Sequence, residues 1–70
     1  MEILSKRLRL LRKERGMRQE DTAAAALGLS TNGYQRYELN VRDPDAPVIV
    51  AMAELFGVST DYLLGRSDER

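Results

Sequence analysis

A glycine-centred turn between two short segments constrains this chain more than any other feature. An alanine run at 23–26 is followed closely by Gly28, then by Ser30 and a second segment that ends at Glu38. The pattern predicts a short helix, a sharp turn at Gly28, and a second helix that begins after Ser30. Two helices joined by so short a turn must cross steeply, and only small side chains let them approach closely. The alanine run, through Ala23 and Ala24, and Gly28 supply this smallness.

The rest of the chain predicts an all-α, compact domain of five helices. Apolar residues recur at helical spacing, and glycines follow several of the periodic segments. The expected helices cover about 3–15, 19 or 20 to 27, 31–39, a segment from Asp45 to Gly57, and 60–64. Ser30, Asp45 and Ser59 are suited to cap the last three. The predicted core consists of Leu8, Leu11, Leu27, Leu29, Tyr37, Met52, Leu55, Phe56 and Leu63, with Leu4, Ile3 and Leu10 on the apolar side of the first helix.

Length and composition exclude several classes of protein. Seventy residues suffice for one small domain, predicted over 1–65, and the polar tail 66–70 is expected to fray or to start a linker. Cysteine and histidine are absent, so disulfides, thiolate metal sites and the commonest general base are missing. No metal or cofactor is expected, and an enzyme is disfavoured. No apolar run approaches the length of a membrane span, so a cytoplasmic protein is the default expectation.

Charge is distributed unevenly along the chain, although the net charge is zero. Residues 1–19 contain seven Lys/Arg and two Glu, a net of +5, whereas residues 20–70 contain four cations and nine anions, a net of −5. One end of the chain could therefore attract phosphate while the other repels it. The alternative is that the first helix simply carries a solvated charged face.

The helix after Gly28 carries a polar face. Thr31, Asn32, Gln35 and Arg36 point away from the expected buried residues of that helix, which are the tyrosines at 34 and 37. Short donors and acceptors on one helix face suit base edges in a DNA major groove, and the fork of Arg36 can bind guanine O6 and N7. The alternative is a set of ordinary surface residues on an exposed helix.

Residues inside and beside this helix suggest further contacts. Gly33 costs up to about 1 kcal/mol relative to alanine in a helix, and close approach to DNA would explain it. Gln19, Asn40 and Arg42 flank the helix and could hold phosphates. For each of these residues, a surface position without a functional role is the alternative.

Four segments resemble the phage-repressor and Cro-type helix-turn-helix family, also called the xenobiotic-response-element family. In chain order they are residues 11–16 (LRKERG), 27–30 (LGLS), 34–38 (YQRYE) and 56–65 (FGVSTDYLLG). The resemblance spans nearly the whole chain. It implies a compact five-helix, lambda-repressor-like domain that binds double-stranded operator DNA, usually as a homodimer.

The resemblance also implies an ion pair and shows two departures. Arg12 and Glu38 match the pair that joins the first helix to the end of the recognition helix in this family. The interval from Gly16 to Gly28 is one residue longer than usual, which leaves Gln19 as the expected cap of the second helix and weakens its match to a phosphate contact. Residues 31–33 (TNG) are smaller than those of many relatives, which predicts few base contacts.

These observations favour a sequence-specific, DNA-binding transcriptional regulator of repressor type. The helix at 31–39 would enter the major groove of an operator. A protein-interaction module, such as an antitoxin or adaptor built on the same fold, is the alternative, because a net charge of zero weakens nonspecific attraction to DNA. No small-molecule ligand or membrane contact is indicated.

Overall fold

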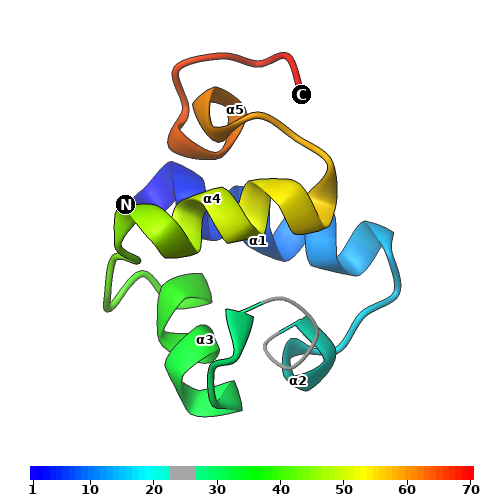
Figure 1. Ribbon diagram of the computed structural model, residues 1–70, viewed down its shortest axis with the longest axis vertical. Helices are drawn as coiled ribbons and strands as arrows, with labels where there is room; N and C mark the ends of the chain where they lie inside the picture. Colours follow the sequence, from blue (N-terminus) through cyan, green and yellow to red (C-terminus); the bar gives the residue numbers. More distant parts are fainter. Residues whose placement is uncertain (23–26) are drawn as a thin grey trace.

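The computed structural model describes residues 1–22 and 27–70, which form five helices. They are α1 (Glu2–Glu14), α2 (Gln19–Thr22), α3 (Thr31–Glu38), α4 (Ala46–Phe56) and α5 (Thr60–Leu64). Figure 1 shows α4 and α1 across the middle of the molecule, with α5 at one end and α2 and α3 at the other. The all-α prediction is confirmed, and none of the described helices is long and apolar enough to cross a bilayer. The predicted packing role of Ala23 and Ala24 falls outside the described residues.

The three predicted N-caps are present. Ser30 Oγ accepts a hydrogen bond from the backbone N–H of Gly33 at 3.1 Å, and the Asp45 carboxylate accepts one from Val48 at 3.1 Å. At the start of α5, Ser59 Oγ accepts one from the third residue of that helix at 3.0 Å. Each cap satisfies a donor that a helix leaves unpaired at its beginning, which is why these boundaries are readable from sequence.

The beginning of α2 differs from the prediction. Gln19 is the first residue of the helix rather than its cap. The carbonyl of Arg18 accepts a hydrogen bond from the N–H of Thr22, and the N–H of Arg18 donates to the Asp21 carboxylate at 3.0 Å. Arg18 therefore occupies the capping position, because the side chain of Asp21 reaches back to its backbone as in a capping box.

The core lies between α1 and α4, and α3 and α5 add buried residues from the two ends of the molecule. Six of the predicted core residues are buried, whereas Leu27, Leu29 and Leu55 are partly buried against them. Ile3 and Leu10 do not widen the buried face of α1, because each remains 47% exposed. The buried apolar residues are Leu4, Leu8, Leu11, Tyr34, Tyr37, Met52, Ala53, Phe56, Tyr62 and Leu63.

Residues 66–70 fold back toward α1 instead of fraying. The N–H of Arg66 donates to the carbonyl of Asp61 at 2.9 Å. The guanidinium of Arg70 then makes two hydrogen bonds with the carboxylate of Glu14, at 2.8 and 2.7 Å. The tail is thus held by a residue at the far end of α1.

Arg7, in the middle of α1, also binds the tail formed by residues 66–70. Its guanidinium lies 4.1 Å from the ring centre of Tyr62 and donates to the Tyr62 carbonyl. It also donates to the carbonyl of Ser67 at 2.7 Å and to the carboxylate of Asp68 at 2.8 Å. A cation on an aromatic face and several shared acceptors join α1, α5 and the tail.

Candidate nucleic-acid interface

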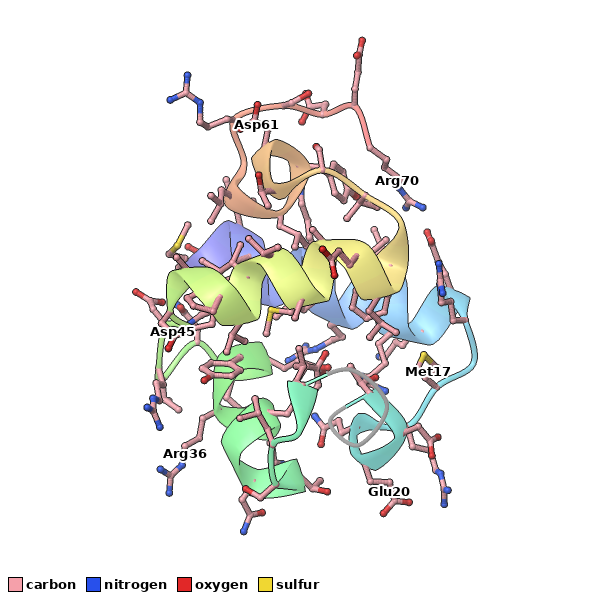
Figure 2. The ribbon with its side chains drawn as sticks, viewed as in Figure 1. Met17, Glu20, Arg36, Asp45, Asp61 and Arg70 are labelled. Carbon is pink, nitrogen blue, oxygen red and sulfur yellow. The ribbon has the colours of Figure 1, made fainter. Side chains whose placement is uncertain are left out.

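The outer face of α3 presents the predicted base-reading side chains to solvent. Thr31, Asn32, Gln35 and Arg36 are all exposed. Figure 2 shows the Arg36 side chain extending away from the domain at the end formed by α2 and α3. On the opposite face, the rings of the two α3 tyrosines are buried, as the sequence predicts. The tyrosines anchor the helix to the core and leave its polar face free.

Gly33 is half-buried in the first turn of α3, next to the N-cap. A Cβ atom built at this position would lie 3.2 Å from Ser30 Oγ, the atom that accepts the hydrogen bond from Gly33 itself. A side chain here would require Ser30 Oγ to shift by a few tenths of an ångström, and Val48 and Tyr62 occupy the same position in the caps of α4 and α5. The cap therefore does not require a glycine, and the close approach of Gly33 to DNA stays a prediction.

Asn40 and Arg42 lie in the loop between α3 and α4. Asn40 adopts the left-handed conformation, with a φ of 59°, and ends α3 as predicted. Its Oδ1 accepts a hydrogen bond from the amino group of Met1 at 2.7 Å, and the same amino group contacts Asp43. Arg42 is exposed and, within the described part of the chain, belongs to no ion pair.

An ion pair also fixes the C-terminal end of α3. Arg12 Nε donates to Glu38 Oε2 at 2.7 Å and Arg12 Nη2 donates to Glu38 Oε1 at 2.9 Å. The side chains are 13% and 1% exposed, respectively. Arg12 Nη1 also donates to the carbonyl of Met17, and Gln19 Nε2 donates to Glu38 Oε1 at 3.4 Å. The predicted pair is present, and it joins α1, α2 and α3 at one carboxylate.

The buried charges shift one another's ionisation. Burial acts to raise the pKa of Glu38, but hydrogen bonds from Arg12 and Gln19 outweigh it and hold the pKa below the ordinary value. The pKa of the Tyr34 phenol is raised, first by burial and then by the neighbouring Glu38 carboxylate. Among the described residues, the Tyr34 hydroxyl makes no hydrogen bond of ordinary geometry, although it lies near this pair. The pair keeps Glu38 ionised in a nearly water-free position.

Most of the positive charge of residues 1–19 is paired with carboxylates, at the surface as well as in the interior. Five of its seven cations form ion pairs, which favours a structural role for them over a free basic surface; they are Lys6, Arg7, Arg9, Arg12 and Arg18. Exposed cations without an ion pair to any described residue include Arg36 on α3 and Arg42 beside it, as well as Lys13 and Arg15 at the end of α1. Unpaired positive charge is thus available on and beside α3 and at the end of α1.

Sequence reasoning missed two buried hydroxyl side chains that support this site. Thr22 is fully buried in α2, and its Oγ1 donates to the carbonyl of Arg18 at 3.3 Å. Ser5 is buried on α1, and its Oγ donates to the carbonyl of Tyr37 at 2.6 Å. The signal for Ser5 was its helical spacing to Arg9 and Arg12, beside the leucine stripe.

The short α2, the turn at Gly28 and the exposed, capped α3 on an all-α scaffold define a helix-turn-helix domain. The helix-turn-helix family model matches residues 8–63, and the chain belongs to this family.

Curated relatives include bacterial transcriptional regulators. The chain is 40% identical over 65 residues to the HTH-type transcriptional regulator ImmR of Bacillus subtilis. The matched region covers 93% of this chain and 50% of that protein. This chain is also 41% identical over 64 residues to the HTH-type transcriptional regulator PrpR of Mycobacterium tuberculosis. That matched region covers 91% of this chain and 13% of PrpR. The chain thus spans half the length of the first relative and a small part of the second.

A solved structure has the same fold. The P22 c2 repressor protein, in a crystal structure with a synthetic operator, superposes with a TM-score of 0.79 and 25% sequence identity. The similarity covers 86% of this chain and 89% of that one. The lambda-repressor-like fold predicted from sequence is confirmed.

Proposed function

We propose that this chain is the sequence-specific DNA-binding domain of a repressor-type transcriptional regulator. The observation that carries the proposal is the contrast within α3, where Arg36 and three further polar side chains are exposed while Glu38 is fixed in the domain. A helix that is held at one end and free on its polar face is suited to enter a major groove. The complex of the similar P22 c2 repressor with operator DNA supports this assignment.

Each polar residue of α3 has a role in the proposal. Arg36 binds guanine O6 and N7 with its two parallel donors, and Asn32 pairs with adenine N6 and N7. Thr31 and Gln35 contact neighbouring base edges, and Gly33 lets the first turn approach the groove. These roles are supported by exposure and by the absence of an ion pair at Arg36 among the described residues.

Phosphate contacts are proposed on both sides of α3. Arg42 and Asn40 lie after the helix, and Gln19 begins α2 before it. Arg42 contributes a charge that is free of partners in the described structure, whereas Gln19 donates one amide hydrogen to Glu38 and keeps its carbonyl and second hydrogen for other contacts. Such contacts fix the register of α3 on the duplex without reading sequence.

The proposal includes a homodimer on DNA. One domain offers few base contacts and has no net charge, so two copies on a palindrome, with half-sites roughly 34–36 Å apart, would combine their contacts. We place the contact between copies at α5 and the residues after it. Exposed Ile3 lies directly beside Gly65, and half-buried Leu64 extends this apolar area.

A protein-interaction module is the second candidate. The observation in its favour is exposed apolar surface at the end of α3, where Leu39 is 55% and Val41 is 69% exposed. A protein partner would cover these residues, whereas DNA binding would leave them at the edge of the groove.

Selection from a pool of random duplex DNA tests the proposed function. The chain should enrich a palindromic sequence, and binding should weaken steeply between low and physiological salt because phosphate contacts release counterions. Sedimentation of the complex should show two chains per duplex. Salt-independent binding or no enrichment at all would leave the protein-interaction module as the better assignment.

A further inference from the structure

Three polar side chains follow one another along α1 beside its leucine stripe. Ser5, Arg9 and Arg12 are four and then three residues apart, so they share one face of the helix. This face lies toward the end of α3, where Ser5 is buried and the Arg9 side chain remains 50% exposed.

All three side chains donate hydrogen bonds to the last turn of α3. Ser5 Oγ donates to the carbonyl of Tyr37 at 2.6 Å, and Arg9 Nη2 donates to the carbonyl of Glu38 at 3.3 Å. Arg12 binds the Glu38 carboxylate. The last carbonyls of a helix have no partner within it, and α1 therefore completes the end of α3.

Ser5 is the short and inflexible member of this group. Its side chain is buried, and the 2.6 Å bond to Tyr37 O is shorter than the 3.3 Å bond that this carbonyl accepts from the N–H of Asn40. The seryl oxygen is only two bonds from Cα, so it holds a tighter position than a long guanidinium does.

We propose that Ser5 is a positioning residue for DNA recognition: its hydroxyl fixes the angle of α3 relative to α1. The inference rests on the proposed function, because the angle matters only when α3 reads a groove. Without the hydroxyl, α3 remains helical and attached through Glu38 and its tyrosines, but its polar face tilts more widely. Sequence-specific contacts need a fixed geometry, whereas phosphate attraction tolerates such tilting.

Ser5→Ala tests the inference under conditions in which every variant is fully folded. Affinity for the selected duplex should fall about three- to tenfold, on the scale of one hydrogen bond, while affinity for an unrelated duplex of the same length stays unchanged. The matched control is Ala53→Gly in α4, a buried core position with no predicted DNA contact, where glycine weakens the domain by helix propensity. The control should leave both affinities unchanged, and an equal loss for Ser5→Ala on both duplexes would overturn the inference.

Hydrogen exchange of the free domain tests the positioning role without DNA. Ser5→Ala should speed exchange selectively at the amides of Leu39 and Asn40, which close the end of α3, while Ala53→Gly should speed exchange in α4. Uniformly faster exchange in Ser5→Ala would make the residue merely stabilising and overturn the proposal. If the wild-type chain selects no duplex, the proposed function fails, while the exchange pattern still decides whether Ser5 orients α3.

Discussion

The inner and outer faces of α3 differ in almost every physical respect. On the inner face, the Glu38 carboxylate is 1% exposed and is bound by Arg12 of α1. The outer face carries Asn32 and Arg36, which are exposed and form no ion pair within the described structure. One helix therefore has a face that holds it in the domain and a face that it presents to solvent.

The difference shows how a small domain without net charge can present a precise surface. Charges near the core are neutralised by partners, so they fix orientation and do not compete for phosphate. Arg36 and Arg42, which have no ion pair among the described residues, lie on and beside α3, where a ligand could bind them. Residues that hold α3 should therefore affect stability, and residues that α3 presents should affect binding.

Removing Arg12 should have the largest effect. Arg12→Ala leaves the buried Glu38 carboxylate with only the longer contacts from Gln19 and Arg9, at 3.4 and 3.9 Å, which should lower the free energy of unfolding by about 3–5 kcal/mol. Urea unfolding of the wild type and the variant measures the change. Arg36→Ala is the matched control and should change stability little, because the side chain is exposed. An unchanged midpoint for Arg12→Ala would show that the pair contributes nothing in solution.

Acid should also lower the free energy of unfolding through Glu38, by less than Arg12→Ala does. The folded pKa of Glu38 lies below its ordinary value of 4.5, so its contribution is present above that pH and is lost as the pH falls through the folded value. Protonated Glu38 can still accept hydrogen bonds, which limits the loss. Unfolding free energies measured from pH 7 to pH 3 should fall less steeply for Glu38→Gln than for the wild type. Equal slopes would assign the acid sensitivity to other carboxylates.

Arg36 and Arg42 should separate base reading from phosphate binding. Arg36→Ala should cost about 1–3 kcal/mol of binding free energy on the selected operator and relax the preference at one base pair. Arg42→Ala should weaken binding to all sequences similarly and lower the salt slope by about one unit. Competition assays with operator variants measure both. If Arg36→Ala weakens every sequence equally, Arg36 binds the DNA backbone and the proposed reading surface is wrong.

Gly33→Ala should have the smallest effect on stability. Alanine gains up to about 1 kcal/mol in helix propensity, and the tight contact of its Cβ with Ser30 Oγ, 3.2 Å away, offsets part of that gain. Thermal unfolding should therefore change little while affinity for the operator falls, because the methyl group occupies the approach to the groove. Unchanged affinity would mean that the glycine is not needed for the approach to DNA.

The helices could largely be predicted from the sequence, because the caps at which they begin are contacts between residues close in the chain. Ser30, Asp45 and Ser59 each cap a helix through an N–H three residues ahead, so neighbouring letters suffice to place them. The Arg12–Glu38 pair spans the fold and was predicted from family resemblance, not from periodicity. The base and phosphate assignments at α3 and its flanks stay predictions.

What could not be predicted depends on contacts between distant residues. Ser5 and the carbonyl of Tyr37 are 32 positions apart, and Arg70 meets Glu14 across 56 positions. A serine in a helix or an arginine in a tail carries no local mark of such a partner. Leu10 shows the opposite error, because an apolar side chain with helical spacing remains exposed when no neighbouring helix covers that side.

The burial of Tyr34 couples the ionisation of its phenol to the folding of the domain. The chain has three tyrosines and no tryptophan, and the rings at 34, 37 and 62 are all buried. Burial, and then the neighbouring Glu38 carboxylate, raise the pKa of Tyr34, so its un-ionised form favours the folded state until the pH rises above the ordinary value of 10. Its phenolate absorbance should therefore appear together with alkaline unfolding, and one ultraviolet signal would report both the proton and the chain.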